Sequence, residues 1–132
     1  MLTYILLVDE DETLHSVFQN IIWKYEDFRL ISAFSGRQGI DIYRIVRPPY
    51  AFFNFHLSDT NGLECLQRVE QIRQMIRGKF YLYAQLVTEQ LSKSALSNGA
   101  ASCILNTPDY NHLKQQLYGI LHRRRSVRMQ KK

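Results

Sequence analysis

The stretch YAFFNFHLSDTNGLE, residues 50–64, decides how the rest of the chain is organised. Its first six residues show no alternation of apolar and polar positions, which is typical of a strand buried on both faces in a parallel sheet. A turn rich in Ser, Asp, Asn and Gly follows, and a helical pattern then begins at Leu63. In open α/β folds ligands bind at the carboxyl ends of the strands, so Asn54 lies where a reactive group is expected.

Length and composition indicate one domain. The chain has 132 residues, 45% of them hydrophobic and 22% charged, which is enough for one core and too little for two. The apolar run Tyr4 to Val8 is too short for a membrane span and lacks the flanks of a secretory signal, so we expect a cytoplasmic protein. Cys65 and Cys103 show no metal or redox spacing, which favours free buried thiols.

The positive charge is concentrated at the carboxyl end. The formal charge is +5, and residues 123–132 (RRRSVRMQKK) hold six of the 17 basic residues and no acidic one. Residues 1–122 therefore keep 11 basic and 12 acidic residues, a formal charge of −1. We predict a domain over residues 1–122 followed by a basic tail over 123–132, and only the tail favours an anionic partner.

Hydrophobic periodicity predicts five strands that alternate with five helices. Strands are expected over residues 3–8, 29–34, 50–55, 80–84 and 102–105. The helices are expected from Leu14 to Tyr25, from a Ser35 cap to Val46, from Leu63 to Ile76 with Gly78 as its stop, from Thr88 to Asn98 with Gly99 as its stop, and from Pro108 onwards. This alternation predicts an α/β fold with a doubly wound parallel sheet and right-handed crossovers. The strand ends at Asp9, Asn54, Ala84 and Asn106 would then gather on one edge.

Three segments in order resemble the receiver domain of two-component response regulators over roughly residues 3–121. They are TYILLVDEDETL (3–14), FFNFHLSDTNGLECL (52–66) and SKSALSNGAASCIL (92–105). The first resembles the family's first strand and acidic cluster. The second resembles its third strand, active-site loop and third helix, and the last resembles its fourth helix and fifth strand. The resemblance implies the flavodoxin-like receiver fold, with five helices around a sheet in strand order 2-1-3-4-5.

The resemblance also implies a degenerate phosphorylation site. The family's phosphoacceptor aspartate matches Asn54, whose amide has no carboxylate to form an acyl phosphate. The family's hydroxyl residue after the fourth strand matches Ala84, and its lysine after the fifth strand matches Asn106. The aromatic switch residue matches Cys103. We therefore expect a pseudo-receiver variant that is not phosphorylated.

One part of the family's site is retained. The acidic pair that helps to hold magnesium matches Asp9 and Glu10, but Asn54 supplies no third carboxylate. We expect no cofactor, with a weak residual magnesium site as the alternative. An acidic strand end at a helix start is stabilising without any metal, because of the helix dipole.

These matches predict a stand-alone interaction module and not an enzyme. Its expected partner is a protein that docks on the fourth helix, fifth strand and fifth helix, and a homodimer through the same face stays open. One alternative is nucleic acid or another acidic surface bound through the tail residues Arg123, Arg124, Arg125, Arg128, Lys131 and Lys132. Another is a phosphorelay receiver phosphorylated at an unusual residue. A solvated end without a partner is the plainest interpretation of the tail.

Overall fold

Five strands alternate with five helices, as the sequence predicts. The computed structural model describes residues 2–73 and 78–130, with side chains up to His122. The strands are β1 (Thr3–Val8), β2 (Phe28–Ala33), β3 (Tyr50–Asn54), β4 (Lys79–Ala84) and β5 (Ala100–Leu105). The helices are α1 (Glu12–Ile22), α2 (Gly36–Val46), α3 (Gly62–Arg73), α4 (Glu89–Ser97) and α5 (Asn111–Gln130).

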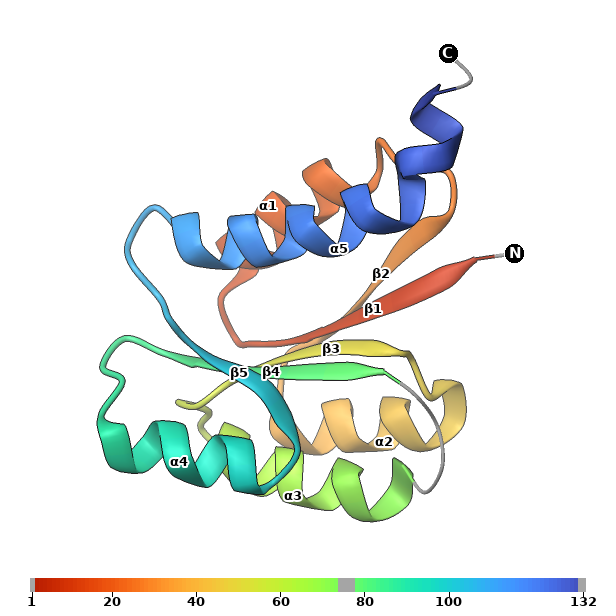
Figure 1. Cartoon of the computed structure of the whole chain (residues 1–132). Helices are drawn as coiled ribbons and strands as arrows, with labels where there is room; N and C mark the ends of the chain where they lie inside the picture. Colours follow the sequence, from red (N-terminus) through yellow and green to blue (C-terminus); the bar gives the residue numbers. More distant parts are fainter. Residues whose placement is uncertain (1, 74–77, 131–132) are drawn as a thin grey trace.

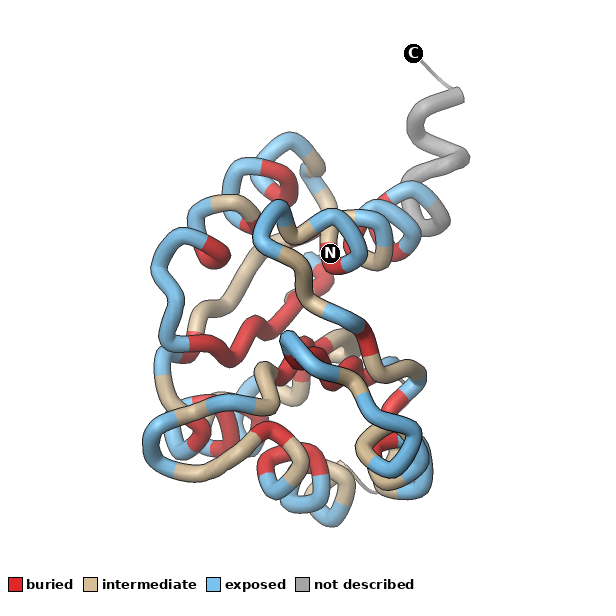
Figure 2. Tube along the Cα trace, turned by 90° about the vertical axis from the view of Figure 1, so that its left-hand side faces the viewer, coloured by how far each residue is buried: buried red, intermediate tan, exposed pale blue. Residues whose placement is uncertain are grey.

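The strands form one parallel sheet in the order β2-β1-β3-β4-β5, which confirms the predicted topology. Helices α1 and α5 cover one face, and α2, α3 and α4 cover the other (Figure 1). Figure 2 shows buried residues concentrated along the strands between these layers. Phe52 and Phe53 of β3 have no exposed surface, as expected for a strand covered on both faces.

Successive residues of each strand supply two separate cores, because side chains alternate across a sheet. On the α1 and α5 side, Phe52 contacts Phe18 edge-on, with ring centroids 5.2 Å apart, and stacks on Tyr81 at 4.8 Å. On the other side, Phe53 and Phe80 contact edge-on at 6.2 Å within the second core. At the carboxyl edge of the sheet, β3 is therefore packed on both faces.

The predicted Ser35 cap of α2 is confirmed, and α4 has a cap at Thr88 that was not predicted. The Ser35 side chain accepts a hydrogen bond from the Gln38 backbone N–H, and Thr88 caps α4 by accepting from Leu91. Gly99 follows α4 with φ +99°, a conformation that favours glycine.

Several predicted boundaries are wrong. The first helix covers Glu12–Ile22 and not Leu14 to Tyr25. The second strand begins and ends one residue earlier than expected, and the fifth begins at Ala100 because its pairing with β4 starts opposite Phe80. Pro108 does not open the last helix, because residues 107–110 form a turn that is closed by the Tyr110 N–H donating to the Thr107 carbonyl oxygen. The end predicted for the third helix, through Ile76, lies outside the described residues.

Helix α5 continues past residue 122, the end predicted for the domain. Its backbone remains helical to Gln130, so most of the predicted basic tail continues this helix. The side chains of Arg123, Arg124, Arg125 and Arg128 lie outside those described, as do Lys131 and Lys132. Within the described parts of the chain, no helix has the length and apolar character needed to cross a membrane.

Candidate functional site at the carboxyl edge of the sheet

The carboxyl ends of β3, β4 and β5 bring three predicted site residues onto neighbouring strands. Asn54 ends β3 opposite Tyr83, and Ala84 ends β4 opposite Leu105. The backbone N–H of Asn106 donates to the Ala84 carbonyl oxygen at 2.8 Å and continues the ladder. The predicted gathering of Asn54, Ala84 and Asn106 at one edge is therefore confirmed.

The Asn54 side chain stabilises the loop that follows it. Its Oδ1 accepts a hydrogen bond from the His56 backbone N–H at 3.2 Å. The loop returns to the end of the strand, where the Gly62 N–H donates to the Phe55 carbonyl oxygen at 3.0 Å. Gly62 is required there, because a Cβ would overlap the Asn54 carbonyl oxygen and lie 2.7 Å from Leu82 Cδ1. Hydrogen bonds therefore hold both ends of the loop, and the amide side chain of Asn54 stands just before it.

The other two matched positions lack the hydroxyl and the cation that the family resemblance places there. Ala84 is 1% exposed, and its methyl group lies within the core. The Oδ1 atom of Asn106 is buried and has no hydrogen-bond partner among the described residues. The edge therefore has a methyl group and a neutral amide where the family resemblance places a hydroxyl and a cation.

The carboxylate of Asp9 is buried and bound by protein donors. The Tyr83 hydroxyl donates to Oδ2 at 2.6 Å, and the Asp11 backbone N–H donates to Oδ1 at 2.8 Å. Asp9 is 4% exposed, and Tyr83 is fully buried. Burial, followed by the charge of Asp9, raises the Tyr83 pKa well above its ordinary value, so the phenol remains a donor at neutral pH.

The sequence alone did not identify Tyr83 as a site residue, because an aromatic strand is expected to fill the core. A usable signal was the alternation of β4. Tyr81 and Tyr83 share one face of the strand, and a buried tyrosine hydroxyl needs a partner. The first strand ends in the acidic cluster on the same edge of the sheet, so Asp9 was a candidate partner.

Two further carboxylates of the acidic cluster, those of Glu10 and Asp11, are also bound. Both Glu10 side-chain oxygens accept from Ser58, from its backbone N–H at 2.7 Å and its hydroxyl at 2.9 Å. Asp11 caps α1 by accepting from the Thr13 N–H, and its second oxygen accepts from the Tyr110 hydroxyl at 2.8 Å. The Asp11 hydrogen bond and burial raise the Tyr110 pKa to about 12.

The described residues contain no group of three or more His, Cys, Asp or Glu side chains that could hold a metal ion. The predicted pair, Asp9 and Glu10, thus stands without a third ligand of these types in that part of the chain. The oxygens of both carboxylates also accept protein hydrogen bonds, with which a bound cation would have to compete.

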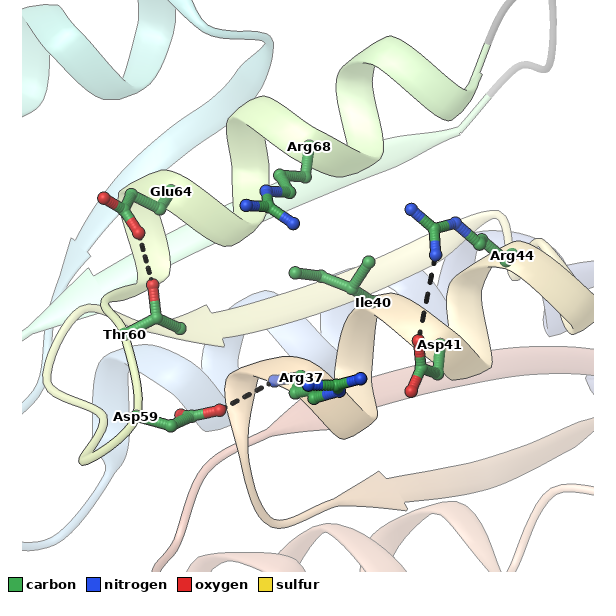
Figure 3. A pocket seen from close by; sticks show the side chains of 8 residues that line it. All are labelled: Arg37, Ile40, Asp41, Arg44, Asp59, Thr60, Glu64 and Arg68. Carbon is green, nitrogen blue, oxygen red and sulfur yellow. Dashed lines mark hydrogen bonds and ion pairs between the residues drawn. The ribbon is translucent and has the colours of Figure 1, made fainter.

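Asp59 has a role that the sequence did not reveal. Its two carboxylate oxygens accept from the backbone N–H groups of Gly36, at 3.0 Å, and Arg37, at 2.9 Å, at the start of α2 (Figure 3). The Arg37 N–H in particular lowers the Asp59 pKa. Asp59 thus links the loop after β3 to α2, and it does not lie at the strand end.

The cysteines match the expected free thiols only in part. Cys65 is free and buried, and burial raises its pKa to about 11. Cys103, at the predicted switch position, is free but only partly buried, and burial raises its pKa as well. It pairs with Leu82 in the β4–β5 ladder. A neutral thiol therefore stands where the resemblance places an aromatic ring.

Comparisons with known proteins agree on the fold. No family model and no curated protein sequence matches the chain. Among solved structures, a CheY-like receiver domain from Methanospirillum hungatei is 20% identical with a TM-score of 0.79, over 96% of this chain and 99% of that one. A signal receiver domain of a putative Luxo repressor from Vibrio parahaemolyticus is 17% identical with a TM-score of 0.78, over 98% and 97%.

A third structure is the CheX–CheY complex with BeF3 and magnesium from Borrelia burgdorferi. The matched chain of this complex is 21% identical to the present chain with a TM-score of 0.75, and the match covers 89% of this chain and 88% of that one. These likenesses extend over nearly the whole chain and reproduce the observed strand order. The chain has the fold of a response-regulator receiver domain.

Proposed function

We propose that this chain is a pseudo-receiver of two-component signalling, which acts in the cytoplasm by binding a protein and is not phosphorylated. One observation carries the proposal: Asn54 ends β3 with Ala84 and Asn106 on the neighbouring strands. An aspartyl phosphate needs a carboxylate nucleophile, and an amide does not supply one. The hydroxyl and cation that would bind the phosphoryl oxygens are missing from the matched positions.

We further propose that the domain works without magnesium and is not an enzyme. Asp9 and Glu10 supply two carboxylates, and their oxygens accept hydrogen bonds from Tyr83, Ser58 and backbone N–H groups. A divalent cation would have to displace these donors, and no third carboxylate stands at residue 54. The pair is therefore better suited to stabilising the edge than to binding a metal.

The proposed partner surface consists of α4, β5 and α5. Strand β5 lies at the edge of the sheet, with α4 and α5 on opposite sides of it (Figure 1). Each of these elements has a large apolar or aromatic side chain that is partly exposed: Leu96 of α4 (51%), Leu105 of β5 (41%) and Tyr118 of α5 (38%). Partly exposed apolar groups beside polar ones are typical of protein interfaces. The CheY in the Borrelia complex binds another protein, CheX, which gives a precedent for protein binding by this fold.

The test of phosphorylation is intact-protein mass spectrometry after incubation with acetyl phosphate and magnesium. We expect no mass gain of a phosphoryl group, while a receiver that carries the aspartate gains one in the same reaction. A labile phosphoryl adduct would contradict the proposal. Peptide mapping of that adduct would then locate the modified residue, and so test the alternative of phosphorylation at an unusual position.

The test of the partner surface compares two substitutions of exposed apolar residues. Leu105→Ser changes the proposed surface, and Ile45→Ser changes α2, where Ile45 is 84% exposed. Proteins captured by the wild-type chain should be lost with Leu105→Ser and retained with Ile45→Ser. Equal capture by both variants would rule out the surface. Repeating the capture without residues 123–132 separates docking on the fold from attraction to the tail.

A further inference from the structure

A groove between α2 and α3 is lined by charged side chains that the proposed function does not use. Its volume is about 460 Å³, within the range of small-molecule sites. Figure 3 shows Arg37 and Arg44 on α2 and Arg68 on α3, with their side chains placed around the central Ile40. The lining residues are Arg37, Ile40, Asp41, Arg44, Asp59, Thr60, Glu64 and Arg68.

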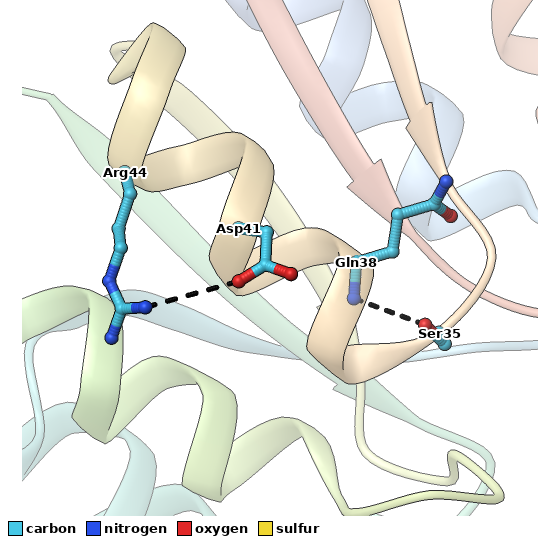
Figure 4. Close-up of polar contacts among 4 residues, drawn as sticks. All are labelled: Ser35, Gln38, Asp41 and Arg44. Atoms are coloured by element: carbon cyan, nitrogen blue, oxygen red, sulfur yellow. Dashed lines mark hydrogen bonds and ion pairs between the residues drawn. The ribbon is translucent and has the colours of Figure 1, made fainter.

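The groove contains three carboxylates, and each already has a partner. Both oxygens of Asp59 accept from backbone N–H groups at the start of α2. Glu64 accepts from the Thr60 hydroxyl at its Oε2. Asp41 pairs with Arg44 at 3.9 Å, one turn along the same helix (Figure 4). The acidic side of the groove is therefore largely engaged within the protein.

The guanidinium groups are less engaged. Those of Arg37 and Arg68 make no hydrogen bond or ion pair within the part of the chain that the structure describes. Among the residues that the structure describes, Arg44 is held only by the long contact to Asp41. The two side chains are 56% and 58% exposed, and such pairs are weak. Although its formal charges balance, the groove therefore has more free donors than free acceptors.

We propose that this groove binds the diphosphate group of a small molecule. Guanidinium groups bind phosphoryl oxygens through paired hydrogen bonds. Arg37 and Arg44 lie seven residues apart, which is about 10 Å along the helix axis. Two linked anionic groups span such a separation better than one, and Arg68 faces them from the neighbouring helix. The buried Ile40 provides an apolar floor between them.

This inference goes beyond the proposed function and does not rest on it. None of the lining residues belongs to α4, β5 or α5. The groove reaches the loop after β3 through Asp59 and Thr60, so a bound anion would contact the segment that follows Asn54. Partner docking and anion binding can therefore be gained or lost separately.

The experiment is isothermal titration of the full 132-residue chain with inorganic pyrophosphate at low ionic strength. We expect saturable binding that weakens with added salt. Arg37→Gln and Arg68→Gln should each weaken it about tenfold, because each removes charge-assisted hydrogen bonds to phosphoryl oxygens. Lys93→Gln is the matched control, since it removes one positive charge from the exposed face of α4 and should leave binding unchanged.

Two further arms identify the source of any binding. Replacing Arg123, Arg124, Arg125 and Arg128 by Gln tests the basic tail, and this variant should still bind pyrophosphate. Orthophosphate and citrate test the ligand class, and both should bind more weakly than pyrophosphate. The proposal is overturned by an absence of binding, by wild-type affinity in both groove variants, by binding that is lost with the tail charges, or by equal affinity for citrate.

Discussion

The carboxylate of Asp59 accepts a 2.9 Å hydrogen bond from the backbone N–H of Arg37, the second residue of α2. These two residues are 22 positions apart in the sequence, and a second bond to Gly36 N–H completes the contact. An exposed loop residue thus acts as an N-terminal cap for a helix to which it does not belong. It satisfies two backbone donors that the helix itself leaves unpaired.

Asp59→Ala should therefore destabilise the fold by about 1 kcal/mol at neutral pH, the usual cost of a lost helix cap. Because the folded-state pKa of Asp59 is lowered, its contribution is fully present above the unfolded pKa of about 3.9 and is lost as the pH falls through the folded value. Urea denaturation at pH 7 and pH 3 should show a difference between variant and wild type that shrinks in acid. A constant difference would contradict this assignment.

Tyr83→Phe should destabilise the fold by about 2–3 kcal/mol, because it leaves a buried carboxylate oxygen of Asp9 without its donor. Chemical denaturation at neutral pH measures this loss. Tyr118→Phe is the control, since Tyr118 is 38% exposed. Equal stability of wild type and Tyr83→Phe would show that the hydrogen bond contributes nothing net.

Asn54→Asp should not restore phosphorylation by itself. The substitution supplies a nucleophile, but Ala84 and Asn106 still provide neither a hydroxyl nor a cation for the phosphoryl group. Mass spectrometry after incubation with acetyl phosphate and magnesium should show little or no adduct. Adding Ala84→Thr and Asn106→Lys should raise the yield. A full yield from the single substitution would mean that the two helper positions are dispensable.

Gly62→Ala should destabilise the fold by about 1–3 kcal/mol, because the new Cβ overlaps the backbone carbonyl oxygen of Asn54. Gly119→Ala is a matched control in α5, where a Cβ meets nothing within 4 Å. That variant should be neutral or more stable by up to about 1 kcal/mol, since alanine is the better helix former. Thermal unfolding of both variants tests the contrast.

The basic tail predicts a salt-dependent affinity for nucleic acid if it acts as an anion-binding segment. With six basic residues engaged, log K should fall with log salt with a slope of about −5. Gel shifts or fluorescence anisotropy with a random duplex should show this slope for the full chain and no binding without residues 123–132. If no binding appears at low salt, the nucleic-acid alternative is excluded.

Most of the fold was predictable because strand and helix periods are local properties of the sequence. The run Tyr50 to Phe55 identified a strand covered on both faces, and the turn residues after it marked where that strand ends. The Ser35 cap was predictable for the same reason. The strand order 2-1-3-4-5 came from the family resemblance, since periodicity alone does not order parallel strands.

The site was predictable only at positions set by the ends of strands. The ends of the strands predict the positions of Asn54, Ala84 and Asn106. The hydrogen-bond partners of Asp9, Glu10 and Asp11, in contrast, lie on other elements. Those pairs are separated by up to 99 positions, and no local pattern records them. The late start of α5 was missed because proline usually suits a first helical turn, whereas here the positive φ of 58° at Tyr110 comes before the helix.

The bond from Tyr83 to Asp9 also has a mechanical consequence. It joins the ends of β4 and β1, which are not neighbours, because β3 lies between them in the sheet. The ends of β1, β3 and β4 are thus connected by this side-chain hydrogen bond as well as by the backbone hydrogen bonds of the sheet. If the end of β1 or β4 moved away from the other, this buried hydrogen bond would break. The three strand ends therefore resist separation together and not one by one.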